Sequence, residues 1–293
     1  MANESDILRI KLMFKGLNKV NSATTFPPVN SLAKTLNSLV DNDHLGDIKF
    51  GINVDNFTIA KFATASIEMW HRSLHSFFIS ASLTKASPLW SSVAGYYSSH
   101  YAIRAFAHLF GYYQLYNKKR IVQLELTGQN YSCNFSKRGS SDREHTVYWK
   151  FVKNYFTQDP FFYLNLDTPP TGQNSEFRSD SGHRNRANYA DHIGKFPVFA
   201  PLDSEDLKTR IYKLSVIEIN DVPIPDVNGY PDIDNVQLIA YHRILKFRVF
   251  VDEILTSNNR FWNLQRNPTW APSYFDFQAV SVDYSGILSS LIS

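Results

Sequence analysis

Apolar residues recur at helical spacing in three long stretches of the chain. From about Ala60 to Leu83, large apolar side chains return every three or four positions, which is the period of a helix with one buried face. Residues 89–113 continue in the same way. The Ser87-Pro88 pair before them is typical of a helix start, because serine caps the first turn and proline suits its first position. The segment 236–255 predicts a third long helix.

Between the second and third of these stretches, apolar and polar residues alternate with a period of two. Residues 121–127 and 131–137 alternate in polarity and are joined by Gly128-Gln129-Asn130, so the pattern predicts a β-hairpin. A similar alternation around Gly51 predicts a further strand or hairpin. Residues 145–156 return to helical spacing.

The remaining segments are less regular. Residues 7–14 fit either a short strand or a short helix, and Asn30-Ser31 can cap another short helix. Residues 159–203 are rich in Pro, Gly, Ser, Asn and Asp, so we expect mostly loop there, apart from a short helix at about 184–193. The final segment combines prolines with large aromatic residues, which predicts an arm packed on the domain or on a partner.

Taken together, these elements predict a mainly α fold. We expect a mixed α/β extension over residues 1–59 and a helical bundle over 60–256, with a hairpin inserted near 120–137. Residues 257–293 are expected to form the aromatic arm. Apolar residues make up 43% of the chain, which is enough to build a core of this size.

Charge and cysteine content bound the kind of protein. The 30 basic and 27 acidic side chains leave a net charge of +3, so any RNA or DNA binding is expected from a local patch rather than from the whole surface. The single cysteine, Cys133, has no disulfide partner in the chain, which favours a reducing compartment. The 89–113 stretch carries His100, Arg104 and His108, which would be costly in lipid. The N-terminus does not resemble a secretory signal, so we expect a cytoplasmic protein that does not bind membranes.

Two pairs of histidines on the predicted helices could take part in chemistry. His71 and His75 lie four positions apart with a glutamate one turn earlier, so they could hold a metal ion or simply lie at the edge of the core. His100 and His108 lie two turns apart and could line a cleft or make structural hydrogen bonds. The chain has no glycine-rich phosphate loop, GxSxG motif or CxxC pair, which argues against nucleotide hydrolases, α/β-hydrolases and zinc ribbons.

The most polar run of the chain is EFRSDSGHRNRANYADHIGK, at residues 176–195. It is either a solvated loop or a short helix that presents cations and imidazoles to an anionic substrate. Arginine and histidine suffice for RNA cleavage without a metal, because histidine can move protons at the 2′-hydroxyl or the leaving 5′-oxygen while a guanidinium binds the phosphate. The spacings in the run that could bring such groups together are Arg178 to His183, Arg184 to His192, Arg186 to His192 and Asn185 to Tyr189.

The order of elements resembles the HEPN superfamily of small helical-bundle proteins. The helix with AGYYSSHYAIRAFAHLF, the later HRNRANYAD segment and the terminal amphipathic helix carry the resemblance, over about residues 60–115 and 176–256. The residues that match the second family element are Arg184, Asn185, Ala187, Asn188 and Tyr189. The resemblance implies a HEPN-like bundle, and many members are metal-independent ribonucleases whose site is assembled across a two-fold dimer.

The family motif has four to six residues between its arginine and its histidine, and this chain departs from that pattern. Five positions after Arg184 stands Tyr189, and His192 is one or two positions too far. The Arg178–His183 and Arg186–His192 pairs have the spacing but not the flanking residues. Non-catalytic members that bind RNA, nucleotides or partners are the alternative that this departure leaves open.

The sequence therefore leads to one main hypothesis, a HEPN-like metal-independent endoribonuclease acting as a toxin or anti-phage effector. In it, Arg184 binds the phosphate, His192 or His183 is the acid/base, Asn185 orients the site and Tyr189 packs or donates a hydrogen bond. Arg178 and Arg186 are expected to bind substrate. The expected partners are RNA, a second copy of the chain and an antitoxin or effector-complex protein, with no cofactor or metal. The alternatives are a non-catalytic RNA- or protein-binding module, and a helical scaffold whose polar run is merely solvated.

Overall fold

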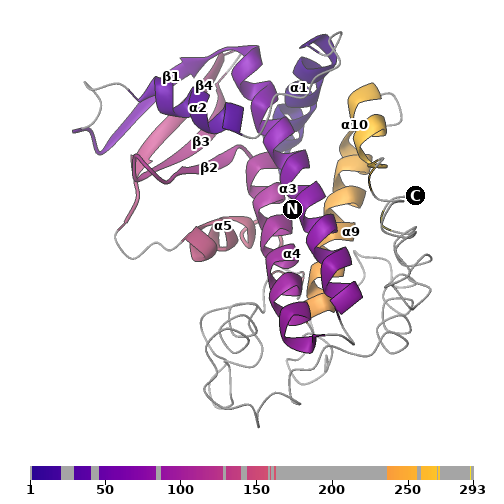
Figure 1. Cartoon of the computed structure of the whole chain (residues 1–293). Helices are drawn as coiled ribbons and strands as arrows, with labels where there is room; N and C mark the ends of the chain where they lie inside the picture. The colour runs from indigo at the N-terminus through magenta and orange to yellow at the C-terminus, as the bar shows by residue number, and fades with distance from the viewer. Residues whose placement is uncertain are drawn as a thin grey trace. The chain divides into compact units, whose positions relative to one another are not determined.

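A computed structural model of the chain describes most of residues 2–157 and 236–268. The described residues are 2–20, 30–40, 46–83, 87–127, 130–139, 144–157, 159, 162, 236–255, 259–268, 270 and 291. Their helices are α1 (Glu4–Val20), α2 (Asn30–Leu39), α3 (Asn56–Leu83), α4 (Pro88–Leu109), α5 (Glu144–Val152), α9 (Val236–Leu255) and α10 (Arg260–Gln265) (Figure 1). The prediction of a mainly α fold is confirmed for this part of the chain.

A small antiparallel sheet accompanies the helices. Its strands are β1 (Lys49–Val54), β2 (Tyr112–Leu115), β3 (Arg120–Thr127) and β4 (Asn130–Lys137), in the order β1-β4-β3-β2. The predicted hairpin is confirmed as β3 and β4, which pair from Arg120 with Lys137 to Thr127 with Asn130. The predicted strand near Gly51 is β1, and it pairs with β4 at the edge of the sheet. The hairpin is thus the centre of a four-stranded sheet and not an isolated insertion.

Polar caps determine where the first helices begin. The side chain of Asn3 accepts a hydrogen bond from the backbone N–H of Asp6 at 2.8 Å, and Asp6 accepts one from the N–H of Asn3 at 3.2 Å. Residues 7–14 are therefore helical and not a strand. Asp55 caps α3 by accepting from the N–H of Thr58 at 2.8 Å, and hydrogen bonds to Thr58 lower the pKa of the Asp55 carboxyl. This cap starts α3 four residues earlier than the apolar period predicts.

The predicted helix over 89–113 is too long by four residues. The structure ends α4 at Leu109, and Tyr112 and Tyr113 belong to β2. Gly111 causes the change of direction, since its φ of 76° lies in the left-handed region that ends helices. The aromatic residues beyond it continue the helical period by chance, but their backbone pairs with β3.

Replacing Gly111 by alanine is expected to destabilise the protein by about 2 kcal/mol, because alanine disfavours this φ and its added Cβ crowds a neighbour. An added Cβ would lie 2.7 Å from the Cβ of Leu124. Urea unfolding followed by circular dichroism measures the loss. Gly46→Ala is the matched control, since an added Cβ there meets nothing within 4 Å. Equal stability of the two variants would contradict this account of the α4 end.

The chain divides into two compact units. Unit 1 comprises residues 1–69, 103–155 and 250–265, and unit 2 comprises residues 70–102, 156–249 and 266–293. Both α3 and α4 contribute residues to each unit.

Aromatic rings fill the core of unit 1. Phe14 of α1 meets Phe261 and Trp262 of α10 edge-on, with ring centroids 6.5 Å apart in both pairs. Phe110 stacks on Tyr155 with centroids 3.9 Å apart. Such pairs add a preferred orientation to the burial of apolar area, so they fix the position of the helices as well as stabilising the unit.

Serine contacts hold α3 and α4 together in unit 2. Ser73 donates to the carbonyl of Ser98 at 2.6 Å, and Ser80 donates to the carbonyl of Ser91 at 2.7 Å. These distances require the helix backbones to approach closely, which only small side chains permit. The serines at these positions therefore allow α3 and α4 to pack closely.

Candidate functional site

A buried polar cluster joins α9 to the rest of unit 2. The Nε2 atom of His242 lies 3.1 Å from Oδ2 of Asp159, and the Nζ atom of Lys246 lies 3.6 Å from the same oxygen. His242 and Lys246 are four residues apart on α9, so they share one face of the helix. The three side chains are 5%, 12% and 9% exposed for His242, Lys246 and Asp159. One carboxylate thus orients an imidazole and an ammonium group together.

Arg243 is the second buried cation of this cluster. Its side chain is fully buried and donates from Nη1 to Oγ of Ser99 on α4 at 2.5 Å. Its guanidinium carbon lies 5.4 Å from the centroid of the Phe162 ring. The hydroxyl and the ring face together compensate part of the cost of burying the charge.

A glutamine on the first turn of α9 makes further polar contacts within unit 2. The side-chain nitrogen of Gln237 donates to Oγ of Ser80 and to Oγ of Ser91, both at 3.0 Å. Gln237 of α9 therefore bridges α3 and α4. The position of α9 in unit 2 is set by directed hydrogen bonds as well as by apolar packing.

A histidine held by a carboxylate can act in proton transfer, but the His242–Asp159 pair is buried. A general acid or base must come within hydrogen-bond reach of its substrate. With so little of His242 and Asp159 exposed, the imidazole is shielded from a polymer such as RNA. The arrangement therefore acts primarily to hold α9 in place. No local sequence pattern indicates this cluster, because Asp159 and His242 are 83 residues apart.

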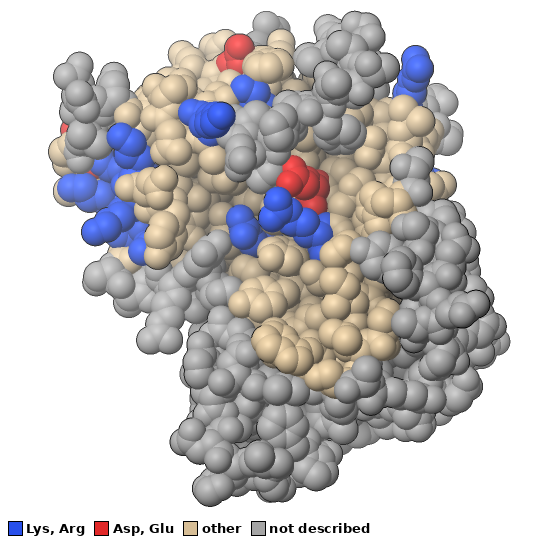
Figure 2. All heavy atoms as spheres, in the orientation of Figure 1, with Lys and Arg blue, Asp and Glu red and all other residues tan. Residues whose placement is uncertain are grey.

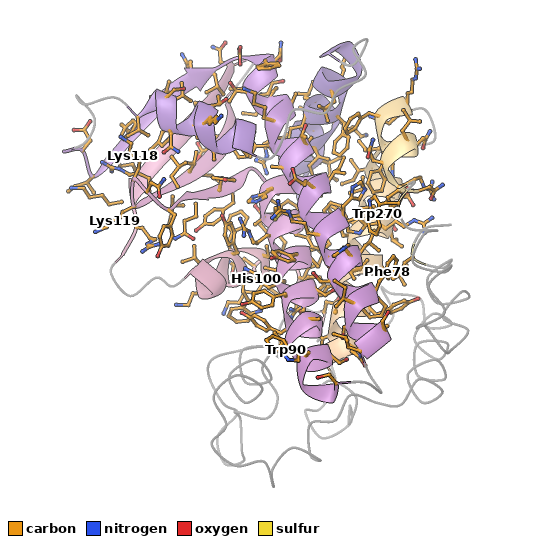
Figure 3. All side chains as sticks on the ribbon, in the orientation of Figure 1. Phe78, Trp90, His100, Lys118, Lys119 and Trp270 are labelled. Atoms are coloured by element: carbon orange, nitrogen blue, oxygen red, sulfur yellow. The ribbon has the colours of Figure 1, made fainter. Side chains whose placement is uncertain are left out.

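The two histidines of α4 have structural surroundings. His108 is buried, and its Nδ1 lies 3.0 Å from the carbonyl oxygen of Tyr112. Burial, together with the charge of Arg104, lowers the pKa of His108 from 6.5 to about 3, which keeps the ring neutral. His100, in unit 2, is buried and stacks on Tyr96 with centroids 6.2 Å apart (Figure 3). For His108, the structural hydrogen bond is the alternative that the structure confirms.

His71 and His75 contact an aromatic residue from the C-terminal segment. Their rings lie 6.1 and 6.0 Å from the ring of Trp270, which also meets Phe78 at 5.9 Å (Figure 3). Burial lowers the pKa of His75. Within the described residues there is no group of three or more His, Cys, Asp or Glu side chains that could hold a metal ion. These contacts favour the interpretation of both histidines as residues at the edge of the core.

Cys133 lies in the interior of the sheet on β4. Burial raises the pKa of its thiol to about 12, so the thiolate needed for nucleophilic chemistry does not form near neutral pH.

The residues predicted to form the site lie outside the described part of the chain. This applies to every member of the 176–195 run that the hypothesis uses: Arg178, His183, Arg184, Asn185, Arg186, Tyr189 and His192. Their roles remain predictions. The predicted short helix at about 184–193 lies in the same segment.

None of the helices in the described ranges combines the length and apolar character needed to cross a membrane. Comparison of the chain with family models, with curated proteins and with solved structures gives no significant match.

Proposed function

We propose that the protein is a HEPN-like, metal-independent endoribonuclease that acts as a toxin or anti-phage effector. The observation that carries the proposal is the HRNRANYADH run at residues 183–192, which lies between the Ala/Tyr-rich helix α4 and the amphipathic helix α9 in the sequence. In this proposal Arg184 binds the scissile phosphate and His192 or His183 moves the proton. Asn185 and Tyr189 orient the site, and Arg178 and Arg186 bind the RNA strand.

The packing of α9 within unit 2 supports this proposal. The indole of Trp70 on α3 donates to the carbonyl of Ile244 at 3.2 Å, and Arg243 is tied to Ser99 of α4. A rigid bundle is a suitable base for catalytic groups, because these must be held in a productive geometry. In this proposal, arginine and histidine side chains cleave RNA without a cofactor. The proposal further includes a cytoplasmic homodimer and an antitoxin or effector-complex partner.

Arg184→Ala is expected to reduce RNA cleavage by about 10²- to 10⁴-fold, and so is His192→Ala if His192 moves the proton, which is the range typical of a lost acid/base or phosphate-binding group. The measurement incubates the purified chain and its variants with total RNA in EDTA and follows fragment formation on gels. His183→Ala, tested in parallel, decides which histidine moves the proton.

The matched control is Arg260→Ala, which removes one exposed arginine at the start of α10, outside the polar run. It is expected to cleave RNA at the rate of the unchanged chain. Intact RNA after incubation with the unchanged protein would contradict the enzyme. A monomeric mass at micromolar concentration would count against a site assembled from two copies.

A second candidate function is a non-catalytic RNA-binding module. The departure from the family spacing at Tyr189 favours it. Retained RNA binding together with intact RNA in the cleavage assay would select this module.

A further inference from the structure

Three chain segments meet at one end of the sheet of unit 1, and each carries cations. β1 begins at Lys49, β4 ends at Lys137 and is followed by Arg138, and the turn between β2 and β3 contains Lys118 and Lys119. We call these five residues the cationic sheet end.

The strand register determines that these cations are neighbours. Lys49 pairs opposite Ser136, next to Lys137, and the backbone N–H of Arg138 donates to the carbonyl of Lys119 at 2.9 Å. Adjacent strands lie about 4.8 Å apart, so the cations extend over roughly 15 Å across the sheet. They form a row across the strands, although they come from segments up to 89 positions apart (138 − 49 = 89).

The charges of this row are available to a ligand. Lys49, Lys119 and Lys137 are exposed, and Lys118 and Arg138 are half-buried. Within the described residues none of the five forms an ion pair, although Lys137 donates to the carbonyl of Gly46 at 3.2 Å. Figure 2 shows lysine and arginine side chains gathered over the sheet at its left edge, and Figure 3 labels Lys118 and Lys119 there.

An exposed aromatic ring lies within the same row. Tyr116 opens the β2–β3 turn and is 66% exposed. The guanidinium carbon of Arg138 lies 5.3 Å from the centroid of its ring, which fixes the cation beside the ring. Exposed lysines beside an exposed ring suit a ligand that combines an anion with a flat aromatic group.

Single-stranded nucleic acid has this combination along its length. Proteins that bind it place a positively charged groove along the phosphates and aromatic side chains against the bases. A lipid surface would supply the phosphates but no bases to stack on Tyr116. A duplex hides the faces of its bases within the stack, so a single strand is the better fit.

We infer that the cationic sheet end binds the phosphate backbone of single-stranded RNA and that Tyr116 stacks on one of its bases. This adds a second RNA contact to the proposed function, carried by residues other than 176–195. It rests on the choice of RNA as partner but holds whether or not the chain cleaves RNA.

The test measures the anisotropy of a labelled oligouridylate of about 16 nucleotides over roughly 50 to 200 mM KCl, with EDTA present. All proteins carry Arg184→Ala so that the probe survives. The test variant is Lys118→Ser/Lys119→Asn/Arg138→Ser, with asparagine at Lys119 because its φ is 49°. It is expected to bind at least about tenfold more weakly. The slope of log affinity against log salt is expected to fall by about 2, from roughly 0.7 for each of three lost contacts.

The matched control removes three exposed cations from α1 and α2 with the same change of charge, Lys11→Ser/Lys15→Asn/Lys34→Ser. It is expected to keep the salt slope of the parent protein. Equal affinities of the test variant and its parent would overturn the inference. All these proteins carry Arg184→Ala, so the binding result does not depend on whether the unchanged chain cleaves RNA.

A second arm separates RNA from other polyanions. Tyr116→Ala changes no charge and is expected to weaken RNA binding about fivefold or more, the range of one lost stack, while leaving binding to inorganic polyphosphate unchanged. Tyr116→Phe should bind RNA like the parent. If Tyr116→Ala binds RNA normally, or if phosphatidylserine vesicles are bound more tightly than RNA through the same cations, the surface is not an RNA site.

Discussion

Replacing Trp70 by alanine is expected to lower the free energy of unfolding by about 3–5 kcal/mol, the range for a large buried aromatic residue. Trp70 is completely buried in unit 2. Its ring stacks on Phe247 with centroids 5.9 Å apart, and its indole N–H donates to the carbonyl of Ile244. Alanine would leave a cavity between α3 and α9 and would remove the donor. Urea unfolding followed by far-ultraviolet circular dichroism measures the change.

The chain offers a matched control in Trp90, which is 58% exposed on α4. Trp90→Ala deletes the same group from a site in water, so its effect should stay within about 0.5 kcal/mol. Trp70→Phe keeps most of the ring but removes the donor, and should cost less than Trp70→Ala. If Trp70→Ala and Trp90→Ala have similar stabilities, the packing of α9 on α3 is not as described.

Acidification is expected to destabilise the protein through His108. Its pKa is about 3 when folded and 6.5 ordinarily, so below 6.5 the unfolded chain takes up the proton first. Its contribution to stability is complete above pH 6.5 and is lost as the pH falls toward 3. At about pH 4 the loss from this one residue is on the order of 3 kcal/mol, from 1.36 kcal/mol for each pH unit.

His108→Asn isolates this effect, because the asparagine amide can still donate to the carbonyl of Tyr112 but does not titrate. The variant loses packing and should be less stable at about pH 7, yet its stability should fall less between about pH 7 and pH 4. The free energy of unfolding is plotted against pH for both proteins, and the difference between the two slopes measures the contribution of His108. Parallel curves for the two proteins would mean that His108 does not carry the pH dependence.

The elements that the sequence predicts correctly depend on short-range patterns. The hairpin of β3 and β4 follows from alternation on both sides of a turn, and α9 follows from the period of its apolar residues. The start of α4 at Pro88 follows from the Ser87-Pro88 pair. In each case the determining residues lie within one or two turns of each other, so their effect does not depend on the rest of the fold.

Local patterns do not predict the outcomes that distant residues determine. The aromatic residues after Leu109 fit the helical period, but Gly111 turns the chain and β3 offers a partner for Tyr112 and Tyr113. Likewise, β1 joins the sheet only because β4 presents a free edge to it. The period of the apolar residues predicts which side chains are buried, but it does not predict which strand a backbone segment pairs with.

By itself, the sequence determined the mainly α class, the central hairpin and the polar run at 176–195 on which the proposed catalysis depends. The tertiary structure alone decided that Asp159 binds His242 and Lys246, and that His108 is neutral and buried. It also decided that lysines and arginine from three segments form one cationic sheet end. Helical and strand periods arise from contacts between near neighbours, whereas burial, pKa and charge clustering arise from groups that only the fold brings together.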